Sequence, residues 1–349
     1  MEREEESSIS KTRRSAIHLD ELDNDYNYSI GENKNIRTLL FLQKEWHYRY
    51  WRSCIAFGIF KFLKVLILEG YEFENGKLPE GIEKLNLLKL LSIEDSVVKE
   101  LPPSICKLPC LQSLNLQIRV LSDIHISLPN SMYEMRRLKH LFMEDGHQSV
   151  GGGKLKLEGL NELETVMGFN SLVDDITHLL KLQKLRVFGG TICHEESLST
   201  IVDHILNHQD QFRSIRLTIL GDTTIDSKDS STLLRRLMMC HTLNVLYIEA
   251  RVRKLPAYEV QLYQNVTELR FWKSKIEEDP MKILEKLPML RELCLSENAY
   301  VGSEMICGAT GFPQLRELVL NDFPNLVEWR VEKGAMPISL LYILVNAIN

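Results

Sequence analysis

The clearest feature of the chain is an apolar pattern that returns again and again. Leucine or another apolar residue occurs with the spacing LxxLxL, as in Leu63/Leu66/Leu68 and Leu290/Leu293/Leu295. Because successive side chains of a strand point to opposite faces, each unit predicts a short strand with one buried face. The middle apolar residue recurs every 19 to 31 residues, at Leu39, Leu66, Leu91, Leu114, Leu141, Val166, Leu185, Ile215, Leu246, Leu269, Leu293, Leu318 and Leu341.

This period is typical of leucine-rich repeats, whose units are about 20–29 residues long. A single unit cannot bury its own leucines, so the units must stack and share one core. The pattern therefore predicts an α/β leucine-rich-repeat solenoid, a horseshoe with a parallel β-sheet on the concave face.

The segments between the predicted strands are of two kinds. Apolar residues at helical spacing predict helices over 198–205 and 233–237, and Asp279-Pro280 is typical of a helix start. These first two helices explain the longest intervals of the repeat. Earlier in the chain, LPEGI at 78–82 and LPPSI at 101–105 predict tight, extended turns instead, because proline disfavours a regular helix there.

Breaks in the pattern suggest how the chain is organised. Residues 1–35 are polar and form a predicted leader, in which Ser15 and Ile17 mark a degenerate first repeat. Residues 36–145 hold the N-terminal repeats, and residues 146–159 are a glycine-rich insertion that we expect to be a mobile loop. Residues 160–349 hold the C-terminal repeats. They end on an apolar unit with no polar cap, so we expect this array to be truncated.

Composition narrows the function classes. The formal net charge of −6 disfavours general nucleic-acid binding, and no apolar run is long enough for a membrane span. The acidic start lacks the apolar stretch of a secretory signal. The seven cysteines are scattered, with no CxxC pair, which favours free thiols in a reducing, cytoplasmic compartment.

Four stretches resemble one particular family. The first is Arg13-Arg14-Ser15-Ala16-Ile17-His18 followed by residues 36–41, and the second is residues 62–70. The third is Leu101-Pro102-Pro103-Ser104-Ile105 with residues 107–114. The fourth is Leu318-Val319-Leu320 with Asn325-Leu326-Val327-Glu328-Trp329 and residues 334–337. In this order they are similar to the repeat domain of plant disease-resistance proteins of the coiled-coil, nucleotide-binding, leucine-rich-repeat (NLR) class.

The resemblance implies a recognition module of an intracellular immune receptor, acting in defense response and innate immunity. Such a domain senses a pathogen effector directly or through a guarded host protein, and it holds the nucleotide switch inactive. The expected partners are therefore proteins, including a nucleotide-binding domain in cis or in trans. A stand-alone leucine-rich-repeat scaffold or substrate receptor remains an alternative. That alternative would need an adaptor segment such as an F-box, which the short polar leader does not supply.

No cofactor is expected in this chain. The resemblance implies that ADP or ATP belongs to a nucleotide-binding domain, and the sequence has no GxxxxGK[ST] loop to bind phosphate. Gly151-Gly152-Gly153-Lys154 is followed by Leu155, so no hydroxyl is placed for a magnesium ion.

Enzyme chemistry also lacks support. His204 and His208 have the i, i+4 spacing of zinc ligands, but HExxH is missing and no third ligand is placed. No GxSxG motif is present for a serine nucleophile. We therefore predict no catalytic residue and no metal ligand, and expect a protein that is not an enzyme.

The candidate site is the exposed side of the strand ladder. The residue between the two strand leucines points away from the core, and four neighbours in this column form a basic and aromatic stripe. The adjacent column adds further aromatic residues, which are typical anchors of protein interfaces. The arginines would favour an acidic partner surface. The predicted partner-binding residues are Arg186, Phe188, Arg216, Tyr247, Glu249, Arg270 and Trp272.

Overall fold

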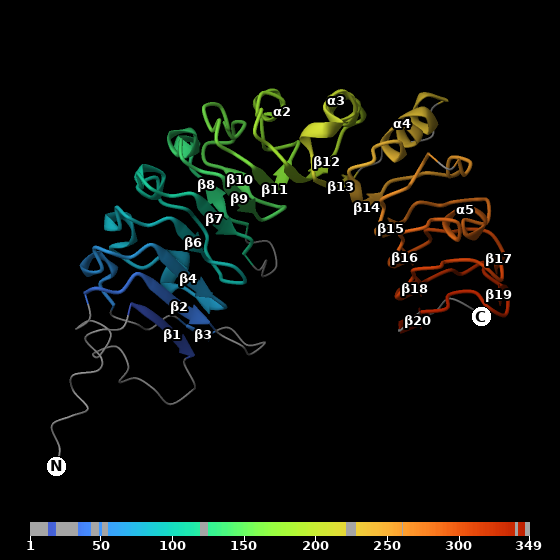
Figure 1. Cartoon of the computed structure of the whole chain (residues 1–349), viewed down its shortest axis with the longest axis horizontal. Helices are drawn as coiled ribbons and strands as arrows, with labels where there is room; N and C mark the ends of the chain where they lie inside the picture. Colours follow the sequence, from blue (N-terminus) through green and yellow to red (C-terminus); the bar gives the residue numbers. More distant parts are fainter. Residues whose placement is uncertain are drawn as a thin grey trace, which may run out of the picture. The chain divides into compact units, whose positions relative to one another are not determined.

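The structure is a computed structural model that describes residues 13–18, 34–42, 49–50, 55–118, 125–220, 228–259, 261–338 and 341–345. Most of the predicted leader lies outside the described residues. The chain forms two compact units, residues 1–185 (unit 1) and residues 186–349 (unit 2). Each unit contains a parallel sheet built from the strands of successive repeats (Figure 1).

In unit 1 the strands follow one another across the sheet in chain order (Figure 1). They are β1 (Arg14–His18), β2 (Thr38–Leu42), β4 (Val65–Glu69), β6 (Leu90–Ser92), β7 (Ser113–Leu116), β9 (His140–Met143) and β11 (Thr165–Asn170). The degenerate first repeat supplies a true strand of this sheet, because β1 pairs with β2 and places Ile17 opposite Phe41.

The connections in unit 1 are mostly short 3-10 helical turns and two-residue strands. The turns are η2 (Phe57–Ile59), η3 (Glu74–Gly76), η4 (Ile82–Lys84), η5 (Ile105–Lys107) and η6 (Asn130–Glu134), and one short helix, α2, spans Ile176–Leu179. The two-residue strands are β3 (Arg49–Tyr50), β5 (Tyr71–Glu72), β8 (Ser127–Leu128) and β10 (Gln148–Ser149). The LPEGI and LPPSI segments form turns that lead into η4 and η5.

In unit 2 the sheet again follows chain order (Figure 1). Its strands are β12 (Val187–Ile192), β13 (Ser214–Leu220), β14 (Leu243–Glu249), β15 (Glu268–Trp272), β16 (Glu292–Ser296), β18 (Glu317–Asn321) and β20 (Leu341–Val345). The connections include α3 (Glu195–Asn207), η7 (Gln209–Gln211), α4 (Lys228–Met238), α5 (Met281–Leu284), β17 (Glu304–Cys307) and β19 (Glu328–Val331).

The helices predicted from apolar spacing are confirmed. Leu198, Ile201 and Ile205 are buried along one side of α3, and Leu234 and Leu237 are buried on α4. The helix predicted at Asp279-Pro280 forms as α5, and the Asp279 carboxylate accepts the Met281 N–H at 3.0 Å. These helices pack over the core because their apolar stripes have no other surface to cover.

The core consists of the repeated leucines. Leu66, Leu91, Leu114 and Leu141 occupy equivalent positions on paired strands, and each is completely buried. Burial of one such side chain contributes about 1.5–3 kcal/mol relative to exposure. Buried polar groups are also satisfied across repeats, since the Ser96 hydroxyl donates to the Leu68 carbonyl at 2.9 Å and accepts from the Tyr71 N–H at 3.0 Å.

The glycine-rich stretch is part of the repeat stack and not a separate insertion. Within it, β10 pairs with β8, and Leu155 and Leu157 are completely buried. Residues 150–154 at its tip are exposed throughout, as are residues 158–159. The division of the chain into two compact units also falls after residue 185 and not within this stretch.

We predict that Leu290→Ala destabilises unit 2 by about 2–5 kcal/mol, because it removes a fully buried side chain and leaves a cavity. Met289→Ala is the matched control, since the neighbouring Met289 side chain is exposed and its loss should change stability by less than about 0.5 kcal/mol. Chemical denaturation followed by circular dichroism measures both. Equal effects of the two substitutions would contradict the assignment of the first leucine of each repeat to the core.

Candidate functional site

One face of the unit 2 sheet carries exposed side chains between the buried leucines. Tyr247 of β14, Arg270 of β15, Cys294 of β16 and Val319 of β18 lie opposite one another in register. On the other side, Tyr247 lies opposite Thr218 of β13. Neighbouring strands are about 4.8 Å apart, so these side chains form a continuous row. We call this surface the exposed sheet face of unit 2.

Tyr247 and Arg270 form the centre of this face. The Arg270 guanidinium lies 4.7 Å from the centre of the Tyr247 ring, a cation–π contact. Arg270 also forms an ion pair with Glu268 at 2.7 Å, and the Tyr247 hydroxyl donates to the same carboxylate at 2.5 Å. Burial raises the pKa of Tyr247 to about 12, aided by the hydrogen bond and charge of Glu268. The hydroxyl therefore stays protonated and holds the ring in place.

Trp272 is the most exposed large aromatic side chain on this face, with 47% of its surface accessible. The Lys273 ammonium lies 5.9 Å from the centre of its ring. Lys273 is itself paired with Glu249 at 3.0 Å and with Glu297 at 3.6 Å. Lys273 thus links Trp272 to Glu249.

A row of carboxylates on the same face was not predicted. Glu268, Glu292 and Glu317 lie directly opposite one another on β15, β16 and β18. Like charges in this arrangement repel. Burial raises the pKa of Glu292, and the charges of Glu268 and Glu317 raise it further. Arg270 offsets part of the repulsion, because it also lies 3.8 Å from Glu292.

The sequence does contain a signal for this row. Each glutamate precedes the middle leucine of its unit, so the dipeptide Glu-Leu recurs at 268, 292 and 317. The predicted stripe uses the residue after the middle leucine and the adjacent column that follows, whereas this row lies in the column before the middle leucine. The row also changes the expected chemistry of a partner. Arg270 is already paired with carboxylates of its own sheet, so its presence no longer favours an acidic partner.

The prediction that Phe188 is exposed on this face is wrong. Phe188 is 2% exposed and lies opposite the buried Ile215 of β13. It is therefore the middle apolar residue of its repeat, three positions later than predicted. The error arose because Gly190 takes the place of the third leucine, so that the preceding Leu182 and Leu185 resembled the start of the pattern.

Arg186 is also misplaced by the predicted register. Leu185 donates its N–H to the Leu182 carbonyl, as Leu138 does to Met135 in an earlier repeat, which makes Leu185 the first leucine of its unit. Arg186 consequently precedes β12, and its carbonyl accepts the Arg213 N–H at 2.7 Å. The residue opposite Arg216 is Gly189. Arg186 therefore does not lie opposite Arg216 in the sheet.

Arg216 is exposed on the face but is displaced along its strand. It lies opposite Val245, two residues before Tyr247, because β13 and β14 change register between Ile215 and Arg216. Its charge still acts on Tyr247, whose pKa it lowers slightly against the larger effects of burial and Glu268. The structure thus brings together Arg216, Tyr247, Glu249, Arg270 and Trp272. A similar shift occurs at the last strand, where Tyr342 and not Leu341 lies opposite Leu318.

The candidate metal ligands form no complete site among the described residues. His204 and His208 stack with ring centres 4.4 Å apart, and burial lowers the pKa of His204 with a further contribution from His208. Within the part of the chain that the structure describes, no group of three or more His, Cys, Asp or Glu side chains is arranged around a common point for a metal. The described cysteines are free thiols.

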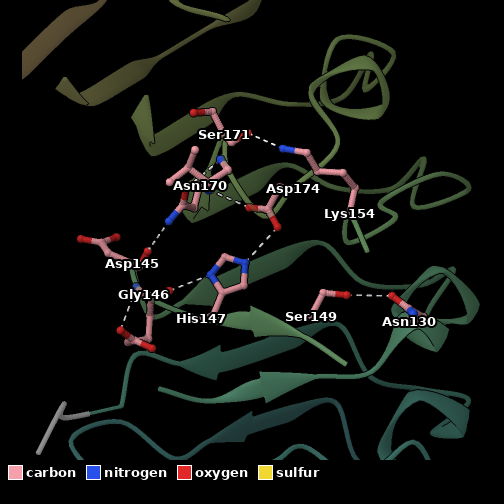
Figure 2. Close-up of polar contacts among 11 residues, drawn as sticks. Asn130, Asp145, Gly146, His147, Ser149, Lys154, Asn170, Ser171 and Asp174 are labelled. Carbon is pink, nitrogen blue, oxygen red and sulfur yellow. Dashed lines mark hydrogen bonds and ion pairs between the residues drawn. The ribbon is translucent and has the colours of Figure 1, made fainter. Parts of the chain in front are cut away.

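A buried ion pair in unit 1 is the second polar cluster that the sequence did not reveal (Figure 2). His147 Nε2 and Asp174 Oδ1 are 2.9 Å apart, and both side chains are completely buried. His147 Nδ1 lies 2.8 Å from the Glu144 carbonyl. Both ring nitrogens face acceptors, so the ring fits this site as an imidazolium. Burial alone would lower the pKa of His147, but the hydrogen bond and charge of Asp174 outweigh it, and the pKa is raised.

Further hydrogen bonds extend this cluster between adjacent repeats (Figure 2). Asp174 Oδ2 accepts the Asn170 N–H at 2.7 Å, and Asn170 donates from its side chain to the Asp145 carbonyl at 2.9 Å. Lys154, which follows the triple glycine, donates to the Ser171 carbonyl at 2.5 Å. Lys154 is thus a link between repeats, and the cluster ties the end of β9 to the end of β11.

The fold, the repeat register and the exposed sheet face define a leucine-rich-repeat protein. A family described as a leucine-rich repeat region matches residues 50–343, and the chain belongs to this family. An LRR protein of Leptospira interrogans has the same fold, with a TM-score of 0.52 and 16% identity over 93% of this chain and 85% of that one. None of the helices in the described ranges is both long and apolar enough to cross a membrane.

The chain is also similar to plant disease-resistance proteins. It is 32% identical over 341 residues to Disease resistance RPP8-like protein 3 of Arabidopsis thaliana and 31% identical over 339 residues to Disease resistance protein RPP8 of the same plant. Each match covers 95% of this chain and 35% of the relative, so the chain spans about a third of the length of these proteins. The resemblance to plant disease-resistance proteins is therefore confirmed.

The corrected register gives a direct test. Phe188→Ala should destabilise unit 2 by about 3–5 kcal/mol because it empties a core position, whereas Arg186→Ala should cost less than about 1 kcal/mol. Urea denaturation of the two variants measures the difference. If Phe188→Ala were as stable as the unsubstituted protein, β12 would have the register first predicted.

The buried ion pair predicts a pH-dependent stability. The pKa of His147 is raised above its ordinary value of 6.5, so the pair stabilises the fold fully below that value and loses this contribution as the pH rises through the raised pKa. We expect Asp174→Asn to cost about 3–5 kcal/mol at about pH 5.5 and clearly less at about pH 9.

The free energy of unfolding of the unsubstituted protein and of the Asp174→Asn variant is measured by denaturation across this pH range. The difference between the two removes the contribution of other titrating groups such as Asp145. Asp203→Asn serves as the control, because Asp203 pairs with Arg236 on the surface and should cost less than about 1 kcal/mol at any pH. A cost for Asp174→Asn that grows with pH would show that His147 is neutral in the folded protein.

Proposed function

We propose that this chain is the protein-recognition module of an intracellular plant immune receptor. The observation that carries the proposal is the similarity to RPP8 and its relatives over 95% of the chain, combined with an exposed sheet face that presents large aromatic side chains. Aromatic and arginine side chains are enriched at the energetic centres of protein interfaces. The similarity to RPP8 supports a role in plant immunity, and the exposed sheet face supports protein binding as the way in which the chain acts.

The module would act by binding, in the cytoplasm, and not by catalysis. Its partners would be a pathogen effector or a guarded host protein, together with a nucleotide-binding domain whose ADP or ATP is bound outside this chain. Because the chain spans about a third of its relatives' length, the switch of those proteins corresponds to sequence beyond this match. The alternative, a stand-alone scaffold or substrate receptor, has no observation that favours it over the immune role.

Within the exposed sheet face, Trp272 and Tyr247 are the expected anchors. Trp272 is half exposed while Lys273 covers one side of its ring, so its free side offers apolar area without a large loss of conformational entropy. Tyr247 is held by Glu268 and Arg270 before any partner arrives. Such preorganisation reduces the entropic cost of association.

We expect the double substitution Trp272→Ala and Tyr247→Ala to weaken partner binding by more than about 2 kcal/mol, roughly thirtyfold. The experiment compares proteins captured from plant tissue by the tagged chain and by this variant, using quantitative mass spectrometry. Val327→Ala is the matched control, since Val327 is 74% exposed and lies just before β19, outside the main sheet. Partners retained by the control and lost by the double variant support the proposal. Partners retained by both would place the binding surface elsewhere.

A separate experiment tests the immune role itself. The chain is co-expressed with the nucleotide-binding domain of an RPP8-like relative, and co-purification is measured. We expect a complex that survives purification, because such repeat domains are proposed to hold the switch inactive. A native polypeptide much heavier than 40.5 kDa in immunoblots would mean that the repeats and a nucleotide-binding domain can belong to one chain. No complex in trans and no larger polypeptide would favour the stand-alone alternative.

A further inference from the structure

A hollow of about 360 Å³ lies between the turns of two consecutive repeats in unit 1. The hollow is far in sequence from the exposed sheet face of unit 2. It has no part in the function proposed from the disease-resistance relatives or from the repeat pattern. The turn that contains η5 supplies one side, and the turn that follows η6 supplies the other. The lining residues are Cys106, Lys107, Leu108, Pro109, Glu134, Arg136 and Arg137.

The charge of this hollow is strongly uneven. Lys107, Arg136 and Arg137 surround it, and Glu134 is the one carboxylate among the lining residues. Among the described residues, no carboxylate lies within 4.0 Å of these three cations, although the chain as a whole carries a net charge of −6. Two other cations of the same unit do have such partners, since Lys139 pairs with Glu164 at 2.8 Å and Lys184 pairs with Glu162 at 2.6 Å.

The backbone around the hollow is fixed. The Leu108 N–H donates to the Ile105 carbonyl at 3.1 Å, and the Arg136 N–H donates to the Glu134 carbonyl at 2.8 Å. The floor is apolar, because Cys106 and Leu108 are at most 5% exposed and the Cys106 thiol lies 4.0 Å from the Met132 sulfur. Arg137 is drawn toward the neighbouring turn by a contact of 4.0 Å with the Cys110 sulfur. The cations therefore belong to hydrogen-bonded turns, next to the buried side chains of Cys106 and Leu108.

We propose that this hollow binds a small phosphate-bearing anion. Two guanidinium groups and one ammonium supply donors that match phosphate oxygens, and arginine does so through two parallel hydrogen bonds. The volume is at the lower end of the range of about 300–1,000 Å³ for small-molecule sites, which fits a phosphate ester of a few carbons. The apolar floor would contact the carbon part of such an ester.

Glu134 sets the specificity. A carboxylate beside an anion site repels phosphate, so it is unfavourable for inorganic phosphate or pyrophosphate. The same carboxylate accepts hydrogen bonds, so it favours a ligand that carries hydroxyl groups beside its phosphate. The ligand class is therefore a hydroxylated phosphate ester. Its source is either a free metabolite or the headgroup of an anionic lipid.

The test uses isothermal titration calorimetry of the full chain with glycerol 3-phosphate and with pyrophosphate at low salt. We expect Arg136→Gln and Arg137→Gln each to weaken both affinities at least about tenfold, the loss of one charge-assisted hydrogen-bonding group. Arg316→Gln is the control of equal charge change, since Arg316 is exposed and is not one of the residues that line the hollow. An equal loss in the control, or no loss in the pocket variants, would overturn the proposal.

Glu134→Gln gives a change of opposite sign that misfolding cannot produce. It should tighten pyrophosphate binding severalfold and improve glycerol 3-phosphate binding less, so the preference for the hydroxylated ester falls. Weaker pyrophosphate binding in this variant would overturn the role of Glu134.

Co-sedimentation with vesicles that contain phosphatidylinositol 4-phosphate, whose headgroup carries hydroxyl groups beside its phosphate, is compared with phosphatidylcholine vesicles and distinguishes the two sources. Sedimentation lost in Arg136→Gln assigns the site to a lipid headgroup, and binding of glycerol 3-phosphate without sedimentation assigns it to a free ester. Absence of both kinds of binding in the unsubstituted chain would contradict the proposal.

Discussion

The structure depends on one constraint, which is that no repeat can bury its leucines without its neighbours. Leu66, Leu91 and Leu114 are completely buried because each lies between equivalent residues of adjacent strands. Parallel pairing fixes the register between repeats, and the buried serines satisfy carbonyl groups that the stack would otherwise leave without partners. The register that this packing imposes determines where the remaining side chains of each repeat lie.

The same register determines which side chains are available on the surface. On the exposed sheet face of unit 2, Arg270 meets Glu268 because it lies on its own strand and Glu292 because it lies on the paired strand β16, and not because a ligand brings them together. The charges of this face are largely balanced within the sheet. Exposed aromatic area is what remains for a partner, and Trp272 supplies most of it. A surface of this kind suits protein recognition, because exposed aromatic side chains are typical anchors of protein interfaces.

Much of this could be predicted from the sequence. The leucine pattern recurs in many units, so Ile, Val or Phe at single positions did not hide the repeats. Apolar spacing was sufficient to identify α3, α4 and α5. The pattern failed where glycine replaced a defining leucine, as at Gly190, because the remaining apolar residues then fitted a false register. The consequence was local, and it moved Phe188 from the core to the surface and added Arg186 to a column in which it does not lie.

Side-chain contacts between different repeats could not be predicted from the sequence. Glu268, Glu292 and Glu317 stand at one repeat position, so an aligned repeat would have shown them as a row. His147 and Asp174 are 27 residues apart and occupy positions that no other repeat reproduces. Only the folded register shows that a buried imidazolium and carboxylate meet there. Such a pair is weak support for stability by itself, because desolvation of both charges offsets their attraction. Its physical effect is to make the junction of two repeats depend on protonation, a property that the leucines cannot provide.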